Sequence, residues 1–340
     1  MRKKYIFAFS SLAILLLLLL FFLSKLTEPK YVNHSREGNL ISEYYREADK
    51  GNSHEVIFLG DCEAYSVFVP PILYEEQGIT SYVRGSPSQS IEQSYYLLLD
   101  TLKYETPRAV VLSVYSLTKF DAPKEAYNRM TLDGMRLSLE KLSAVTVSVG
   151  EDESAASYLL PLLRFHSRIY ELEAEDIEYI FDRPRVSHNG YFMQKRISPA
   201  EVGDSEIVGA AEPISKRNFA YLEKIAEACR TRGTELILIK APISSWRYPW
   251  YDEWDEEIES FAKDNGLEYY NLIKYADEIG IDMSCDTYDG GFHLNLYGAE
   301  KTSRYFGKIL SEVYGIGGDK NAIWEEKLKE YYKERNDEEN

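Results

Sequence analysis

The longest hydrophobic feature of the chain is an almost unbroken apolar run at its beginning. The run covers residues 5–23, contains only two serines as polar residues, and follows three basic residues at positions 2–4. About eighteen residues in a helix rise roughly 27 Å, which is close to the thickness of the hydrocarbon core of a bilayer. We therefore predict a cytoplasmic stub and a transmembrane anchor within residues 1–28.

The segment after the apolar run distinguishes an anchor from a cleaved signal peptide. A signal peptide has a shorter apolar region and ends in small residues of the Ala-x-Ala kind, whereas residues 24–29 contain no such site. We expect an uncleaved, single-pass anchor in the cell membrane, with a cytoplasmic N-terminus because of the leading cations. Lys25 and Lys30 act against that orientation. A cleaved signal peptide is the alternative, and it leads to the same extracytoplasmic location.

Beyond a polar spacer at residues 29–53, short apolar runs alternate with amphipathic helical segments. Runs that are apolar at consecutive positions are typical of strands buried on both faces of a sheet. Strand, helix and strand follow one another at intervals that fit right-handed βαβ units, which build a parallel sheet. We predict a three-layer α/β/α domain over residues 54–314, with parallel strands that begin near Val56, Tyr82, Val110, Leu236 and Glu268.

Two parts of the chain depart from this alternation. Residues from about 120 to 214 have a mixed helical pattern with a turn signal at Asn189-Gly190. We predict that they form a helical insertion that caps the ligand edge of the sheet. Residues 315–340 are rich in Glu and Lys, and we predict a charged helical tail with a solvated face.

The first predicted strand ends at a candidate nucleophile. Residues 56–59 are apolar, Gly60 stops the run, and Asp61 and Cys62 follow directly. In a parallel sheet the ligand crevice opens at the carboxyl ends of the strands. Cys62 therefore lies where a nucleophile is expected, on the turn between strand and helix. A buried cysteine without a chemical role is the alternative, because free cysteines are among the most buried residues.

A second motif precedes the last predicted helix of the domain, in the stretch Asp289-Gly-Gly-Phe-His293-Leu-Asn-Leu-Tyr-Gly-Ala. A Gly-Asp-Ser strand exit near the start, paired with an Asp-x-x-His element before the last helix, marks the SGNH (GDSL-type) hydrolase superfamily. The chain resembles a membrane-anchored member of that superfamily, with Cys62 in place of the family serine. The resemblance covers roughly residues 54–312 and depends on motifs at its two ends.

The resemblance implies a catalytic group of Cys62, His293 and Asp289. A thiol nucleophile needs a nearby base, and a histidine base needs an oriented carboxylate on its other nitrogen. The family places that carboxylate three residues before the histidine, whereas Asp289 lies four before it. The two intervening glycines give the backbone freedom to compensate. Asp286 is the second choice for this carboxylate.

Candidates for oxyanion stabilisation or substrate binding follow the other strand exits. Gly85 aligns with the family block whose glycine N–H helps to form the oxyanion hole, and Asp61 lies beside the nucleophile. The family's next block carries an asparagine that this chain lacks. Ser113 or Ser116 is the nearest polar group there. This departure argues against strong hydrolytic activity.

Substrate contacts are predicted in two further places. An aromatic loop carries Trp246, Tyr248 and Trp250, and flat aromatic rings are suited to stacking on sugar rings. The alternative is that these rings pack on the following helix. In the insertion, Arg164 and His166 could bind an anionic group of the substrate. The alternative is that the arginines there pair with carboxylates of the insertion itself.

Composition excludes several classes of function. The net charge of −17 argues against nucleic acid as a partner and against adhesion to an anionic membrane through a basic patch. Three cysteines without a CxxC pair form neither a disulfide framework nor a zinc site, so we expect no metal and no cofactor. A disulfide between Cys62 and Cys285, which an extracytoplasmic location permits, is the alternative to a free nucleophile at Cys62.

Taken with the resemblance, these features predict an esterase or O-acyltransferase that acts on cell-surface or exported polysaccharide. A thioester on Cys62 is well suited to passing an acyl group to another acceptor, which favours transfer over hydrolysis. Related membrane-anchored members of the superfamily receive acyl groups from a multi-span membrane acyltransferase, which is the implied partner. The alternative is a non-catalytic relative that binds glycan or serves as a scaffold for a membrane complex.

Overall fold

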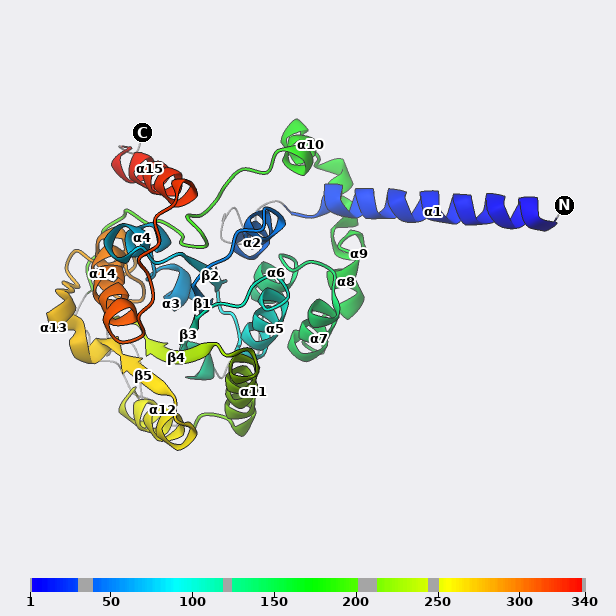
Figure 1. The fold of residues 1–340 in the computed structure, drawn as a ribbon. Helices are drawn as coiled ribbons and strands as arrows, with labels where there is room; N and C mark the ends of the chain where they lie inside the picture. Colours follow the sequence, from blue (N-terminus) through cyan, green and yellow to red (C-terminus); the bar gives the residue numbers. More distant parts are fainter. Residues whose placement is uncertain (1, 30–38, 119–123, 201–212, 244–250, 338–340) are drawn as a thin grey trace.

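A five-stranded parallel sheet forms the centre of the folded domain (Figure 1). The structure is a computed structural model that describes residues 2–29, 39–118, 124–200, 213–243 and 251–337. The strand order is β2-β1-β3-β4-β5, and every neighbouring pair is parallel. The predicted parallel α/β fold and its five strands are thus confirmed: β1 (Val56–Gly60), β2 (Ser81–Gly85), β3 (Ala109–Ser113), β4 (Glu235–Lys240) and β5 (Glu268–Asn271).

Helices cover both faces of the sheet, which explains why β1, β2 and β3 are buried at every position. Alternate strand residues, such as Ile57 and Leu59, pack with α2 (Leu40–Asp49), α5 (Ile91–Thr101), α11 (Lys216–Arg232) and α12 (Tyr251–Asn265). The intervening residues, such as Phe58, pack on the other face with α3 (Cys62–Tyr65), α4 (Pro70–Gln77) and α14 (Leu296–Glu312). The three-layer architecture follows from this alternation.

The helices of the insertion pack mainly against α5 and against the N-terminal helix α1 (Arg2–Thr27). They are α6 (Glu125–Leu132), α7 (Leu139–Ser148), α8 (Ala155–Leu159), α9 (Leu162–Phe165), η3 (His166–Tyr170) and α10 (Ala174–Phe181). A later part of the insertion lies along the sheet edge, because the N–H of Val83 in β2 donates to the carbonyl of Asn189. Further on, the Leu296 N–H donates to the Gln194 carbonyl, which brings the insertion to the His293 loop.

Helix α1 extends away from the body of the protein, and its end is docked on the insertion (Figure 1). It is long and apolar enough to cross a membrane, by length and composition. The Ser24 hydroxyl accepts a hydrogen bond from the Leu162 N–H at 3.1 Å. Arg168 donates to the carbonyls of Thr27 and Glu28, each at 3.0 Å. The predicted N-terminal apolar helix is confirmed. Hydrogen bonds from the insertion fix its last turn.

The C-terminal tail forms the expected helix, α15 (Ala322–Asn336), but the expectation of a solvated face is wrong for one side of it. Trp324, Lys327 and Tyr331 are buried. Trp324 stacks on Tyr74 of α4 with ring centroids 5.4 Å apart, and Lys327 pairs with Glu47 of α2 at 2.7 Å. Spacings of three and four residues place these side chains on one helix face, which docks on the domain while the charged remainder faces solvent.

Candidate active site

Two glycines allow the exits of β1, β2 and β3 to meet. Gly60 pairs in register with Gly85, and its φ of +149° is unfavourable for other residues. A Cβ atom on Gly60 would lie 2.7 Å from the Cβ of Ser113, and one on Gly85 would lie 3.2 Å from the Asp61 carbonyl oxygen. The structure thus brings Asp61, Gly85 and Ser113 together at the strand exits, where Cys62 follows.

Asp61 acts as the N-cap of the short helix α3. Its Oδ1 accepts a hydrogen bond from the Glu63 N–H at 3.1 Å, and the side chain is fully buried. A capping aspartate fixes the first helical turn because it satisfies a free backbone N–H. Cys62, which is partly exposed, is the first residue of that turn.

His293 connects Cys62 to a carboxylate. Its Nδ1 lies 2.5 Å from Asp289 Oδ2, and its backbone N–H donates to Asp289 Oδ1 at 2.9 Å. Cys62 lies close enough to the ring to raise its pKa. Burial by itself lowers the pKa of His293, but a negative charge on Cys62 and the hydrogen bond to Asp289 raise that pKa well above its ordinary value. Burial opposes ionisation of Asp289, but its hydrogen bonds and its attraction to His293 lower the net pKa.

The loop that carries this pair is held by a residue that sequence reasoning missed. Asn295 caps α14 through Oδ1, which accepts from the N–H groups of Tyr297 and Gly298, and its Nδ2 donates to the Cys285 carbonyl at 2.7 Å. A polar residue directly before a helix is the signal that could have identified it. Between Asp289 and His293, two glycines with φ of +79° and +95° accommodate the four-residue spacing.

The second-choice carboxylate has other partners. Asp286 is almost fully buried, pairs with Lys301 Nζ at 2.6 Å and accepts a hydrogen bond from the Asp282 N–H at 2.7 Å. Asp289 is therefore the carboxylate that the structure places on His293. Cys62 and Cys285 are both free thiols, so the alternative disulfide is not formed in this structure.

A buried ion pair next to the candidate nucleophile also escaped sequence reasoning. Glu63 and Lys240 are only 1% and 6% exposed, and Glu63 Oε1 lies 2.7 Å from Lys240 Nζ. Lys240 ends β4, and its ammonium lies 4.7 Å from the ring centre of Tyr115 in η2 (Val114–Thr118). The pair ties α3 to the exit of β4. A lysine that directly follows an apolar strand was the available signal.

Ser113 presents an unusual hydroxyl at the same strand exits. The residue is 2% exposed, and its Oγ has no hydrogen-bond partner within the described residues. A buried hydroxyl without a partner is unfavourable for folding, so such groups are uncommon away from functional sites.

The predicted substrate residues do not join this group. Trp246, Tyr248 and Trp250 lie outside the described residues. Arg164 on α9 pairs with Glu125 at 2.8 Å, and His166 at the start of η3 is exposed. Both elements lie beside α1, well separated from α3 in Figure 1. A role for these two residues in substrate binding stays a prediction. The described residues contain no group of three His, Cys, Asp or Glu side chains that could hold a metal ion.

Comparisons with known proteins leave the family open. No family model matches the chain, and no curated protein matches it. A solved structure of a protein assigned to the G-D-S-L lipolytic family, from Desulfitobacterium hafniense, is 11% identical and aligns over 76% of this chain and 100% of its own. A GDSL-like lipase from Bacteroides thetaiotaomicron is 13% identical over 80% and 99%. The TM-score is 0.38 in both cases, so the assignment of site and activity depends on the geometry of this chain.

Proposed function

We propose that the chain is a membrane-anchored, extracytoplasmic esterase or O-acyltransferase of the SGNH type, which acts on cell-surface or exported glycan. The observation that carries this proposal is the hydrogen-bonded pair of His293 and Asp289, with Cys62 near the imidazole at the exit of β1. A nucleophile, a base and an orienting carboxylate in this order are the arrangement that acyl transfer requires.

In the first half of the reaction the Cys62 thiolate attacks the carbonyl carbon of an ester. The resulting oxyanion would accept hydrogen bonds from the Gly85 N–H and the Ser113 hydroxyl. Collapse of this intermediate breaks the ester C–O bond, and His293 gives its proton to the departing alkoxide. The products of this half are an alcohol and a thioester on Cys62.

In the second half an acceptor hydroxyl, from water or a sugar, gives its proton to His293 and attacks the thioester carbonyl. Collapse breaks the C–S bond and releases the new ester or acid. Cys62 and His293 then return to the thiolate and imidazolium forms. Asp289 stays ionised throughout and holds the imidazole in position, in keeping with its lowered pKa.

Acyl-enzyme trapping tests this chemistry on the full chain in mild detergent. With p-nitrophenyl acetate we expect one acetyl group on the Cys62 peptide, detected by mass spectrometry, in the wild type and in the control Cys285→Ser. We expect none on Cys62→Ala, and a rate of acetylation that is roughly a hundredfold lower for His293→Ala. Adding N-acetylglucosamine oligosaccharides then separates transfer, which yields an acetylated sugar, from hydrolysis.

Absence of acetylation in folded wild-type protein, or acetylation at Cys285 alone, would contradict the proposal. The first result favours the alternative of a non-catalytic glycan-binding or scaffold protein, which the missing asparagine after β3 supports. Binding of the same oligosaccharides without any turnover would then be the next observation to make.

A further inference from the structure

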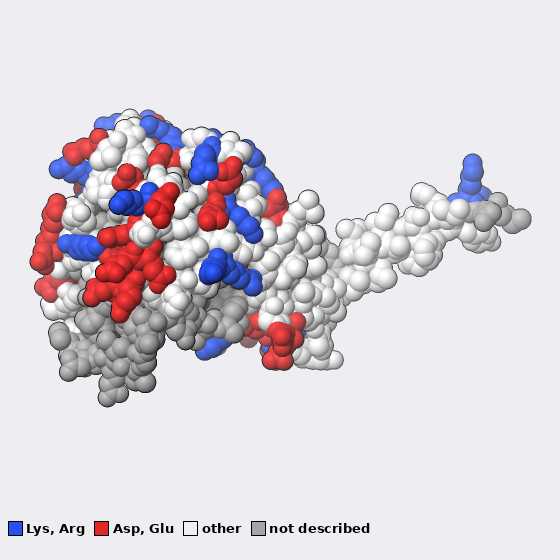
Figure 2. Space-filling model, turned by 90° about the horizontal axis from the view of Figure 1, so that it is seen from below, with Lys and Arg blue, Asp and Glu red and all other residues white. Residues whose placement is uncertain are grey.

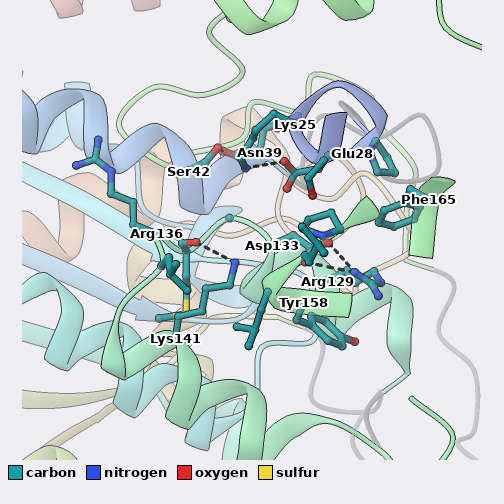
Figure 3. A pocket seen from close by; sticks show the side chains of 18 of the residues that line it. Lys25, Glu28, Asn39, Ser42, Arg129, Asp133, Arg136, Lys141, Tyr158 and Phe165 are labelled. Atoms are coloured by element: carbon teal, nitrogen blue, oxygen red, sulfur yellow. Dashed lines mark hydrogen bonds and ion pairs between the residues drawn. The ribbon is translucent and has the colours of Figure 1, made fainter. Parts of the chain in front are cut away.

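A cavity lies where the N-terminal helix meets the body of the protein (Figure 3). The cavity has a volume of about 940 Å³ and shares no lining residue with the Cys62 group. One wall is the end of α1, with Phe21 and Lys25. The others come from α2, from α6 and the loop after it, from Lys141 of α7, and from α8 to α10. Because α1 is the predicted membrane span, this cavity lies at the membrane surface.

The charge of the cavity differs in sign from that of the whole chain. Its lining contains four acidic side chains, Glu28, Asp49, Glu125 and Asp133, and seven basic ones, Lys25, Arg46, Arg129, Arg136, Lys141, Arg164 and Arg183. The chain as a whole carries a net charge of −17. A local excess of cations in an acidic protein indicates a site for an anion.

Three of the basic side chains have no carboxylate at ion-pairing distance within the described residues. Lys141 is buried and donates to the Met135 carbonyl at 3.1 Å. Arg183 donates to the Ser42 hydroxyl at 2.8 Å, and Arg46 donates to the Arg183 carbonyl. The other four basic residues are each paired with one of the cavity's acids.

The environment of Lys141 disfavours its charge in the empty cavity. Burial lowers the pKa of Lys141, and the charge of Asp133 only partly offsets this effect. Figure 3 shows Lys141, Asp133 and Arg129 gathered on one side of the cavity, opposite Lys25 and Glu28 of α1. An anion bound between these walls would supply the missing countercharge for Lys141.

The rim of the cavity is apolar and continuous with α1. Phe21, Leu159 and Phe181 line it and are also exposed, Phe181 at 81%. In Figure 2 the surface at the base of the helix is mostly uncharged, with one cluster of acidic residues beside it, whereas the body carries many charged residues. A ligand that fits both parts has an anionic head and apolar chains that can lie along α1 in the bilayer.

We propose that this cavity binds the anionic headgroup of a membrane phospholipid, with the phosphate at Lys141 and Arg46 and the acyl chains against Phe21 and the apolar rim. The volume of the cavity accommodates a headgroup with its glycerol. Binding of the headgroup there would hold the domain at a fixed height and angle on the membrane. The proposal depends on α1 being embedded in the bilayer and is independent of the chemistry at Cys62.

Native mass spectrometry of the full chain, released from non-ionic detergent, tests the proposal. We expect dioleoyl phosphatidylglycerol to bind about tenfold more tightly than dioleoyl phosphatidylcholine. Lys141→Gln and Arg46→Gln should each weaken phosphatidylglycerol binding by about tenfold, since each removes a charge-assisted contact. The matched control is Lys308→Gln, which changes an exposed lysine on α14 and should leave binding unchanged.

Thermal melting of each variant establishes whether it is folded. If Lys141→Gln does not fold, Arg46→Gln still tests the proposal. Equal binding of the two lipids, or phosphatidylglycerol binding that neither folded variant reduces, would overturn the proposal. An arm with inorganic phosphate distinguishes the source of the anion. If phosphate alone displaces phosphatidylglycerol at equal concentration, the site takes a soluble anion and the lipid assignment is wrong.

Discussion

The hydroxyl of Ser113 at the exit of β3 is buried and has no hydrogen-bond partner within the described residues. A buried hydroxyl without a partner lowers the stability of the folded state, so its presence here needs a functional reason. In the proposed reaction its use is to donate to the oxyanion, a charge that exists only in the intermediate. Activity and stability should therefore respond in opposite directions when it is removed.

We predict that Ser113→Ala lowers the rate of Cys62 acetylation by about ten- to a hundredfold while the melting temperature stays the same or rises. The matched control is Ser148→Ala in α7, which removes another buried hydroxyl without a partner in the described residues. That variant should keep the wild-type acetylation rate. A Ser113→Ala protein with full activity would contradict the oxyanion role.

The second residue-scale prediction concerns Asp133, whose pKa burial raises to about 6 although Arg129 opposes the shift. Between the ordinary value and about 6, the folded state binds more protons than the unfolded state, so stability falls as pH rises through this window. Asp133→Asn should remove this pH-dependent loss of stability, which corresponds to roughly 1–3 kcal/mol of unfolding free energy. Melting temperatures of the wild type and the variant from pH 4 to pH 7 measure the difference.

An oppositely shifted carboxylate provides the control for Asp133. The hydrogen bond from Arg136 lowers the pKa of Asp49, so its contribution is present at neutral pH and is lost as pH falls. Asp49→Asn should therefore leave the decline between pH 4 and 6 in place. If Asp133→Asn shows the same decline as wild type, the buried position of Asp133 is not what destabilises the folded state in that range.

At the scale of elements, the helix with the most surprising role is α15. Its sequence is dominated by charged residues, yet Trp324 inserts its ring beside Tyr74 and near His54, and Tyr331 donates to Glu300 of α14 at 2.7 Å. The helix thereby joins α4, α14 and α2 across one side of the domain. We infer that it is part of the folded unit rather than an appended tail.

We predict that Trp324→Ala destabilises the full chain by about 3–5 kcal/mol, because it removes a large buried ring from a packed site. The neighbouring Ile323→Ala is the control, since Ile323 is 53% exposed and its loss should change stability by less than about 1 kcal/mol. Unfolding followed by circular dichroism in detergent measures both. Equal effects for the two variants would contradict a docked α15.

At the scale of the whole molecule, the end of α1 is fixed on the insertion, so a membrane-embedded α1 would set how the domain faces the membrane. The last turn of α1 is tied to α9 and η3 by Ser24 and Arg168, so the helix does not leave the body through a free linker at that point. With α1 in a bilayer, as we predict, the cationic cavity at the base of α1 would lie nearer to the membrane than α3, which Figure 1 shows away from that helix.

We predict that protease added to intact protoplasts removes the domain while the N-terminal helix stays with the membrane. The three leading cations and the lack of a cleavage site after the apolar run are the reasons. The control is the same digestion after lysis, together with N-terminal sequencing of the mature protein. Digestion only after lysis would contradict the topology, and a mature N-terminus beyond residue 23 would indicate a cleaved signal peptide.

The sequence by itself determined the parallel α/β fold, because that information is local. Apolar runs define strands, glycines and caps end the elements, and the intervals between strands permit only crossover connections. The same local signals predicted the exit of β1, where Cys62 lies, and the loop before α14, where His293 lies. The catalytic roles of both residues are still to be tested. From sequence, Asp289 was preferred to Asp286 as the partner of His293 because of its spacing from the histidine, which the two intervening glycines can accommodate.

Only the tertiary structure decided which polar groups are paired. Several contacts join residues that are far apart in the chain, and no local pattern identifies which residue pairs with which. Examples are Glu63 with Lys240, Asp286 with Lys301, and Trp324 with Tyr74. Composition likewise cannot show the Ser113 hydroxyl, which has no partner among the described residues, or the basic cavity beside α1, because it reports only a net charge of −17 for the whole chain. Pairing depends on distances between elements, and those distances are set by packing rather than by any single stretch of sequence.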